Sequence, residues 1–143
     1  MSHSKVKNWV HVIFHTKDSK PIIDIKIEDK IHDFIKKKLN NMDCYVEEIN
    51  GMKEHVHILF ILNQQKCLAD VVKQIKGSSS HWINQEGLTK NTFAWQIGYA
   101  AFSISESHVR NVANYIRNQK EHHKKMTFEM EFQSIMKALG MSD

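Results

Sequence analysis

The sequence contains little cysteine or proline and no long apolar run. Its two cysteines, Cys44 and Cys67, form no CxxC pair, which argues against a disulfide framework or a thiolate zinc site, so we expect two reduced, buried thiols. No apolar segment approaches the roughly 20 residues of a membrane helix, and the first residues, Met1 to Lys5, lack the apolar stretch of a secretory signal. We therefore expect a cytoplasmic protein without a membrane partner.

The residues that are present are typical of one globular domain with a basic surface. At 143 residues, 41% hydrophobic and 25% charged, the chain predicts a single domain over residues 1–143. The net charge of +4 favours an anionic partner only modestly. Lysines cluster at 36–38, at 73 and 76, and at 120–125. Such runs are often solvated helix faces, an interpretation that stays open for 36–38, but the last cluster follows the Tyr115 helix pattern and favours phosphate contact.

Hydrophobic periodicity predicts alternating strands and helices. The first half is expected to contain a strand over 8–16 with both faces covered, a loop over 17–26 around Pro21, a helix over about 28–42, a strand over 43–49, a turn at Asn50–Gly51 and a strand over 54–62. The second half is expected to contain a helix over about 68–84 that is weakened at Gly77, a turn over 87–92, a strand over 93–105 bent near Gly98, a helix with Tyr115 capped by Ser105 or Ser107, and a last amphipathic helix capped by Thr127.

This order predicts an α+β fold. Strand, helix, strand, strand, helix, strand is the βαββαβ order of a ferredoxin-like, RRM-like antiparallel sheet with its helices on one face. We expect this core over about 7–105, followed by the tyrosine helix and further C-terminal helices over about 106–140.

Two separated motifs carry candidate chemistry. In a strand, His55 and His57 project from one face, and on a helix Tyr115 and Gln119 point the same way, about 40° apart. Two imidazoles and an amide oxygen could hold a divalent cation beside a phenol. Each motif alone has a plainer interpretation, because strand histidines are commonly hydrogen-bonded without metal and a tyrosine is more often a packing residue.

Other histidines add little to this set. His11 and His15 form a second same-face pair, so a same-face histidine pair is by itself weak evidence for a metal site. We expect the exposed His122–His123 pair to be solvated or near phosphate rather than metal-bound, because adjacent helix residues diverge by about 100°.

Taken together, the motifs resemble one family. They are His55-Val56-His57, Trp95-Gln96, Gly98-Tyr99, Ala101-Phe102-Ser103, Tyr115-Ile116, Asn118-Gln119 and His122-His123. In this order, from about Val10 to Glu131, they are similar to the single-tyrosine transposases of the smallest bacterial insertion sequences, within the HUH nuclease superfamily. Ala100 departs from the pattern, where a second glycine is expected after Gly98-Tyr99.

The resemblance implies a DNA transposase that cleaves and rejoins single-stranded DNA. It implies that Tyr115 is the nucleophile, forming a 5′-phosphotyrosine link and a free 3′-hydroxyl, and that His55, His57 and Gln119 hold Mg²⁺ or Mn²⁺. It further implies a nucleoid-associated homodimer that exchanges the tyrosine helix and binds hairpins near the element's ends. The expected DNA contacts are Lys73, Lys76, Arg110, Arg117, Lys120, His122, Lys124 and Lys125.

Two other functions remain possible on the same fold. A noncatalytic nucleic-acid-binding module, such as a domesticated transposase, would bind DNA without metal-dependent cleavage. A metal-dependent hydrolase would use His55 and His57 with a water molecule and leave no protein on the DNA.

Overall fold

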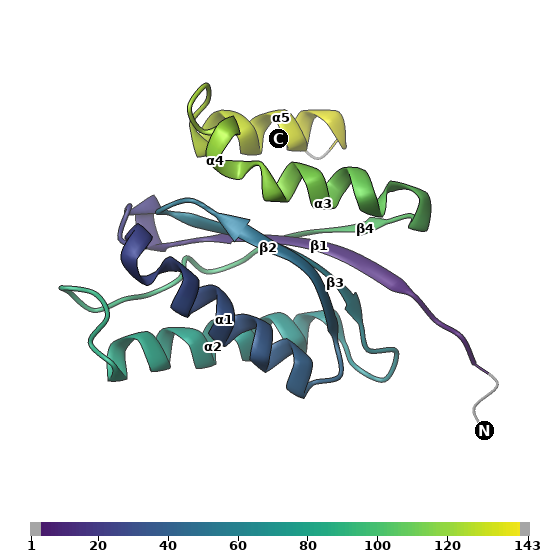
Figure 1. Cartoon of the computed structure of the whole chain (residues 1–143), viewed down its shortest axis with the longest axis horizontal. Coiled ribbons are helices and arrows are strands. Elements are labelled where there is room, and N and C mark those ends of the chain that lie inside the picture. The colour runs from purple at the N-terminus through teal and green to yellow at the C-terminus, as the bar shows by residue number, and fades with distance from the viewer. Residues whose placement is uncertain (1–3, 141–143) are drawn as a thin grey trace.

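Four antiparallel strands form one sheet with helices over both of its faces (Figure 1). The structure is a computed structural model and describes residues 4–140. The strands lie in the order β2-β3-β1-β4 and comprise β1 (Asn8–His15), β2 (Tyr45–Gly51), β3 (His55–Leu62) and β4 (Ala100–Ile104). One face is covered by α1 (Ile25–Asn41) and α2 (Leu68–Gln85), and the other by α3 (Val109–Arg117), α4 (Gln119–His122) and α5 (Phe128–Ala138).

The expected fold class is confirmed. The described chain follows the βαββαβ order and then adds three C-terminal helices, with two short 3₁₀ turns at Lys17–Ser19 and Glu106–His108. The division into a core over 7–105 and helices over 106–140 stays a prediction. Residues 1–3 and 141–143 of the expected domain, including part of the N-terminal segment without a secretory pattern, lie outside the described residues. Within residues 4–140, no helix combines the length and apolarity needed to cross a membrane.

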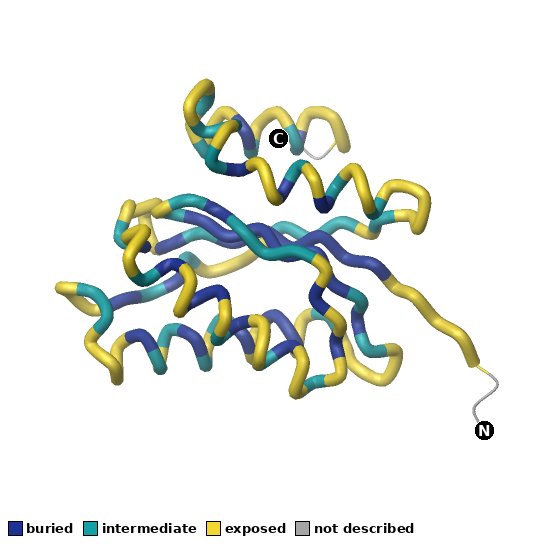
Figure 2. The backbone as a smooth tube through the Cα atoms, viewed as in Figure 1, coloured by how far each residue is buried: buried dark blue, intermediate teal, exposed yellow. Residues whose placement is uncertain are grey.

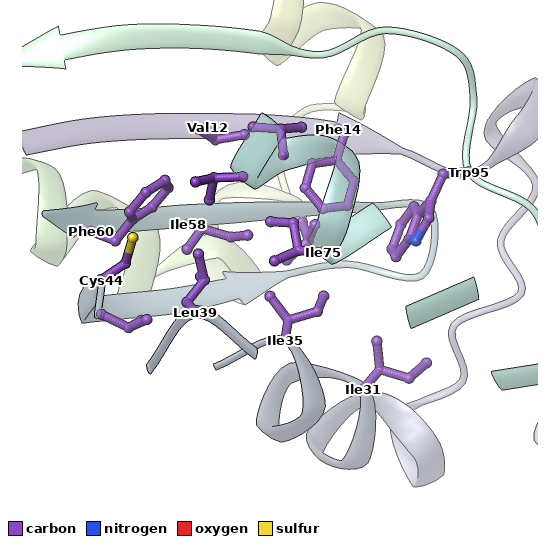
Figure 3. Packing of buried hydrophobic residues seen from close by; sticks show 14 of the residues in the cluster. Val12, Phe14, Ile31, Ile35, Leu39, Cys44, Ile58, Phe60, Ile75 and Trp95 are labelled. Atoms are coloured by element: carbon purple, nitrogen blue, oxygen red, sulfur yellow. The ribbon is translucent and has the colours of Figure 1, made fainter. Parts of the chain in front are cut away.

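The hydrophobic core lies between the sheet and the α1–α2 layer. Alternate side chains of β1 and β3 point into it because successive strand residues face opposite sides. They pack against apolar residues of the two helices, and Figure 3 shows Val12, Phe14, Ile58, Phe60, Ile31, Ile35, Leu39 and Ile75 in this cluster. Burying each such side chain stabilises the fold by about 1.5–3 kcal/mol. The core therefore fixes which residues of β1 and β3 face the other way.

The opposite face of the same strands carries the histidines. A smaller apolar cluster of Trp9, Leu59, Ala113 and Ile116 packs α3 against this face. Here the register pairs Ile13 with His57 and His15 with His55. Figure 2 shows that β1 and β3 are buried along most of their length, as expected for strands covered on both faces. The histidines are consequently enclosed between the sheet and the C-terminal helices.

The expected turn at Asn50–Gly51 is wrong. Both residues belong to β2, where they pair with His57 and Val56, and the turn falls at residues 52–54. Asn50 instead donates from Nδ2 to the carbonyl oxygens of Ile116 and Arg117, 3.0 Å away in each case. Gly51 lies so close to β3 that an added Cβ would be 2.1 Å from the carbonyl oxygen of His55. The asparagine thus secures the end of α3, and the glycine permits close strand approach.

The strand expected over 93–105 is also shorter than predicted. Only Ala100–Ile104 pairs continuously with β1, and Trp95 makes a single bridge with Thr16. The segment before β4 is held instead by the Lys76 ammonium, which donates to the carbonyl oxygens of Gln96 and Gly98. Gly98 has a φ of 96°, which favours glycine and bends the chain where a bend was expected.

Helix ends and cysteines differ in detail from the expectations. Helix α2 continues through Gly77 without interruption. Thr127 caps α5 as predicted, accepting from the Met130 backbone N–H at 3.2 Å. Ser105 precedes the 3₁₀ turn, but its hydroxyl contacts His108 Nδ1 and not a backbone N–H. Cys44 is buried, whereas Cys67, expected to be buried, is exposed because it precedes the first turn of α2.

His32 on α1 is buried without a hydrogen bond at Nε2 among the described residues. Burial, together with the nearby positive charge of Lys120, lowers the pKa of this imidazole to about 4. The ordinary pKa of histidine is about 6.5, so between these values the unfolded chain binds a proton here that the folded chain does not.

The close approach at Gly51 predicts that Gly51→Ala destabilises the protein. The added methyl group has to displace strand backbone, which costs about 1–3 kcal/mol for overpacking of this kind. Gly77→Ala is the matched control: nothing lies within 4 Å of its Cβ, so it should stabilise α2 by about 0.5–1 kcal/mol. Urea unfolding measures both; equal effects of the two variants would contradict this reading of Gly51.

The depressed pKa of His32 predicts a pH-dependent contribution to stability. As pH falls from 6.5 to 4, protonation of the unfolded chain at His32 should lower the free energy of unfolding by about 1.4 kcal/mol per pH unit. His32→Gln cannot bind this proton, so the stability difference from the wild type should change with that slope below pH 6.5 and stay constant above it. If urea unfolding gave free energies for the wild type and His32→Gln that changed in parallel with pH, the depressed pKa of His32 would be contradicted.

Candidate metal and nucleophile site

Strand β3 supplies two buried imidazoles to one enclosed point. The side chains of His55 and His57 are fully buried, and both Nε2 atoms approach Glu131 Oε1, at 3.4 Å and 3.2 Å. The Nδ1 atoms face the other way: that of His55 lies 2.6 Å from Glu54 Oε1, and that of His57 lies 2.9 Å from His11 Nε2. Metal-binding histidines typically have one ring nitrogen hydrogen-bonded to a group outside the metal site, so that the other ring nitrogen faces the metal.

Tyr115 and Gln119 reach the same point from two different helices. The predicted continuous helix is interrupted at Asn118, whose φ of −94° and ψ of 19° end α3 before Gln119 begins α4. Gln119 is nevertheless fully buried, and its Oε1 lies 3.0 Å from His55 Nε2. The Tyr115 ring packs edge-on to His57, with centroids 5.9 Å apart. The four residues expected to form the site are therefore brought together.

Glu131 on α5 is the residue that sequence reasoning missed. Its Oε2 accepts hydrogen bonds from the Tyr115 hydroxyl and, at 2.8 Å, from Gln119 Nε2. Ligand atoms of His55, His57 and Glu131 lie within 4.8 Å of one another, a donor set that could hold a metal ion. The available signal was a glutamate on the apolar side of an amphipathic helix, three residues after Phe128 and four before Ile135. A carboxylate in that position requires a buried partner.

Two factors set the pKa values in the site: the burial of the ionisable groups and their hydrogen bonds to Glu131. Burial alone would raise the pKa of the Glu131 carboxyl, but hydrogen bonds from His55 and His57 hold it far below its usual range. Burial would lower the pKa of His55, yet hydrogen bonds to Glu131 and Glu54 raise it. Burial lowers the pKa of His57 to about 4, so this ring is neutral at neutral pH, the form that binds metal.

The phenol is protonated in this arrangement. Burial and the hydrogen bond to Glu131 raise the pKa of Tyr115 well above its ordinary value. The ring of His122 lies against it, with centroids 4.7 Å apart, and His122 Nε2 is buried without a hydrogen-bond partner among the described residues. Tyr115 therefore rests as a hydrogen-bond donor, next to both the histidines and a buried carboxylate.

The other histidines diverge in their environments. His15 is half-buried and contacts the carbonyl oxygen of Thr16 through Nδ1. Burial, with neighbouring His57, lowers the pKa of His11 to about 3, which makes it a neutral outer partner. The expectation that His122 and His123 are both exposed is wrong, because both are partly covered. The side chain of His123 is 5% exposed and lies 3.1 Å from both Gln119 Oε1 and Glu131 Oε1.

Most residues expected to contact DNA have partners within the chain. Lys120 donates to Glu28, Asn50 and the Gly51 carbonyl oxygen, and Arg117 pairs with Glu48. On the surface, Lys124 pairs with Glu121. Lys73 and Lys76 belong to α2, on the opposite side of the sheet from the histidines, where Lys73 lines a groove of about 850 Å³. Two further expected contacts are exposed: Arg110 on α3, the helix that carries Tyr115, and Lys125, which follows α4.

Comparison with known proteins agrees with the fold and with the family that the motifs resemble. The sequence model described as "Transposase IS200 like" matches residues 4–119. A candidate transposase from Deinococcus radiodurans R1 has a similar structure, with a TM-score of 0.67 and 22% identity over 83% of this chain and 95% of that one. The second similar structure is a REP-associated tyrosine transposase bound to a REP hairpin, with a TM-score of 0.65 and 15% identity over 86% and 74% of the two chains.

No curated protein sequence matches significantly. The family match covers most of the chain and includes His55, His57, Tyr115 and Gln119, whereas His123 and Glu131 lie beyond its end. At these identities the two solved structures show the fold alone. The family match, which confirms the resemblance drawn from the motifs, shows that this chain belongs to the family of IS200-like transposases.

Proposed function

We propose that this transposase cleaves and rejoins single-stranded DNA through Tyr115, using a divalent metal. One observation carries the proposal: a phenol, two imidazoles, an amide and a carboxylate converge at a buried point between β3 and the C-terminal helices. Packing alone does not require five polar groups at one point, and buried polar groups are costly unless they have partners. The family match supports a DNA-processing role for this set.

The metal ligands are His55 Nε2, His57 Nε2 and Gln119 Oε1, with Glu131 as a carboxylate ligand from α5. Mg²⁺ or Mn²⁺ in this position would polarise the scissile phosphate as a Lewis acid and orient it. Glu54 and His11 hold the two β3 imidazoles so that Nε2 faces inward. The neutral state of His57 suits this role, because a protonated ring cannot bind metal.

Tyr115 is the nucleophile. Its attack forms a bond between the phenolic oxygen and phosphorus, and the bond from phosphorus to the 3′-oxygen of the preceding nucleotide breaks. The phenol loses a proton, and the released 3′-hydroxyl gains one. The DNA end stays on the protein as a 5′-phosphotyrosine, so the reverse attack by a 3′-hydroxyl rejoins strands without an external energy source.

Partners and assembly are part of the proposal. We infer that the substrate carries hairpins near the ends of an insertion sequence, since a similar structure is that of a transposase bound to a REP hairpin. Exposed Arg110 and Lys125 are the strongest of the expected phosphate contacts. The other expected cations of the C-terminal helices, Arg117, Lys120 and Lys124, have acidic or carbonyl partners. We propose a homodimer at the nucleoid, in which exchanged α3 helices would make the same contacts to the sheet.

Tyr115→Phe tests the nucleophile. Without the phenolic oxygen, covalent capture of labelled single-stranded DNA in the presence of Mn²⁺ should fall by at least about a thousandfold. Tyr45→Phe is the control, because Tyr45 is 57% exposed on the edge strand β2 and pairs with Ile61, at the other end of β3 from His55. Denaturing gels with substrate labelled on either side of the cut measure the adduct. Capture by Tyr115→Phe would refute the proposal; free cleaved DNA would indicate a hydrolase, and binding without cleavage a noncatalytic module.

Glu131→Gln tests the carboxylate ligand. This change keeps the shape of the side chain but removes its charge, so Mn²⁺ affinity should fall by about 10–100-fold. Glu129→Gln on the exposed side of the same helix should leave affinity within about twofold, since exposed charges act weakly through water. Isothermal titration with Mn²⁺ and no DNA measures both variants. Unchanged or tighter binding by Glu131→Gln would remove Glu131 from the ligand set.

A further inference from the structure

We propose that His123 is a third imidazole ligand of this centre, and that the resulting donor set prefers Mn²⁺ to Mg²⁺. The inference rests on the proposed function, because it extends the same metal site. His123 Nε2 lies 3.1 Å from Glu131 Oε1 and 3.1 Å from Gln119 Oε1. The oxygen of Glu131 thus has the Nε2 atoms of three histidines around it, at 3.1 to 3.4 Å.

The local chain geometry directs His123 to this point. His123 follows α4, and its backbone N–H donates to the carbonyl oxygen of Gln119, so the two side chains project from the same side of one turn. Its imidazole also packs against that of His55, with centroids 4.8 Å apart. The side chain is 5% exposed. A buried imidazole that shares its neighbours with two candidate ligands is placed for coordination and not for solvation.

His123 has to move inward when the cation binds. The atoms of His55, His57 and Glu131 lie within 4.8 Å of one another, and His123 is outside that tighter group. The segment that carries it allows such a shift, because α4 spans only Gln119–His122 and the non-helical Asn118 separates it from α3. The centre would therefore tighten on loading, with His123 Nε2 moving closer to the ligand atoms of His55, His57 and Glu131.

The third imidazole changes which metal the centre favours. Mg²⁺ prefers oxygen ligands and keeps most of its water, whereas imidazole nitrogen suits transition-metal dications. Three imidazoles with Gln119 and Glu131 form a mixed nitrogen and oxygen set, for which Mn²⁺ should bind at least about tenfold more tightly than Mg²⁺. Two imidazoles with oxygen ligands would discriminate less.

The test measures metal binding by the full-length protein without DNA. His123→Ala should weaken Mn²⁺ binding by about 10–100-fold, as measured from the electron paramagnetic resonance signal of free Mn²⁺. The matched variant is His122→Ala, since His122 is adjacent but lies against the Tyr115 ring, and it should change affinity by less than about twofold. His55→Ala reports on the proposed site itself and should weaken binding at least as much as His123→Ala.

Counting the imidazole nitrogens bound to Mn²⁺ distinguishes a His123 that coordinates the metal from one that only positions the other ligands. Electron spin-echo modulation by ¹⁴N in the Mn²⁺-loaded wild type should show three imidazole nitrogens, and in His123→Ala two. The wild-type count needs no variant, so misfolding of His123→Ala cannot remove the test. Two nitrogens in the wild type, or weaker binding by His123→Ala with an unchanged count, would overturn the inference while leaving the proposed site intact. Unchanged affinity in both His55→Ala and His123→Ala would refute the proposed metal site as well.

Discussion

The rest of the site depends on the hydrogen bonds and ion pairs of the Glu131 carboxylate. It lies 2% exposed and joins α5 to the histidines of β3 and to Tyr115 of α3. Removing a carboxylate from water is costly, and only the surrounding donors compensate for it. Because those donors come from β3, from α3 and α4, and from His123 just after α4, the same contacts hold the C-terminal layer in register with the sheet. Stability of this layer and geometry of the site are therefore coupled.

Strand alternation separates the structural and chemical roles of the sheet. On β3, Val56, Ile58 and Phe60 belong to the core beneath α1 and α2, while His55 and His57 face the other layer. The core fixes the strand against slipping, since a shift by one residue would exchange the two faces. Gly51 and Asn50 then bring β2 and the end of α3 close to β3. The site is thus built on an inner strand of the sheet that is buried along nearly its whole length.

Much of this could be predicted from local sequence patterns. Period-two and helical patterns predicted the order of strands and helices along the chain, and residue spacing predicted that His55 and His57 share one face, as do Tyr115 and Gln119. The remainder depended on tertiary contacts that no local pattern encodes. The dipeptide Asn50–Gly51 matches a turn pattern, but its role is tertiary, since Asn50 donates to the end of α3 and Gly51 lies against β3. The position of Glu131 on the apolar side of α5 signals burial, but its partners on β3, like the His55 ring that His123 contacts, are more than 60 residues away in the sequence.

The most direct test of the central claim is to locate the covalent bond to DNA. Protein incubated with single-stranded DNA from the flanks of its own gene and Mn²⁺ would be digested with trypsin and nuclease, then sequenced by tandem mass spectrometry. The account predicts a 5′-linked nucleotide on Tyr115, within the peptide spanning residues 111–117, and no such product without metal. A nucleotide on another residue, or cut DNA with unmodified Tyr115, would contradict it.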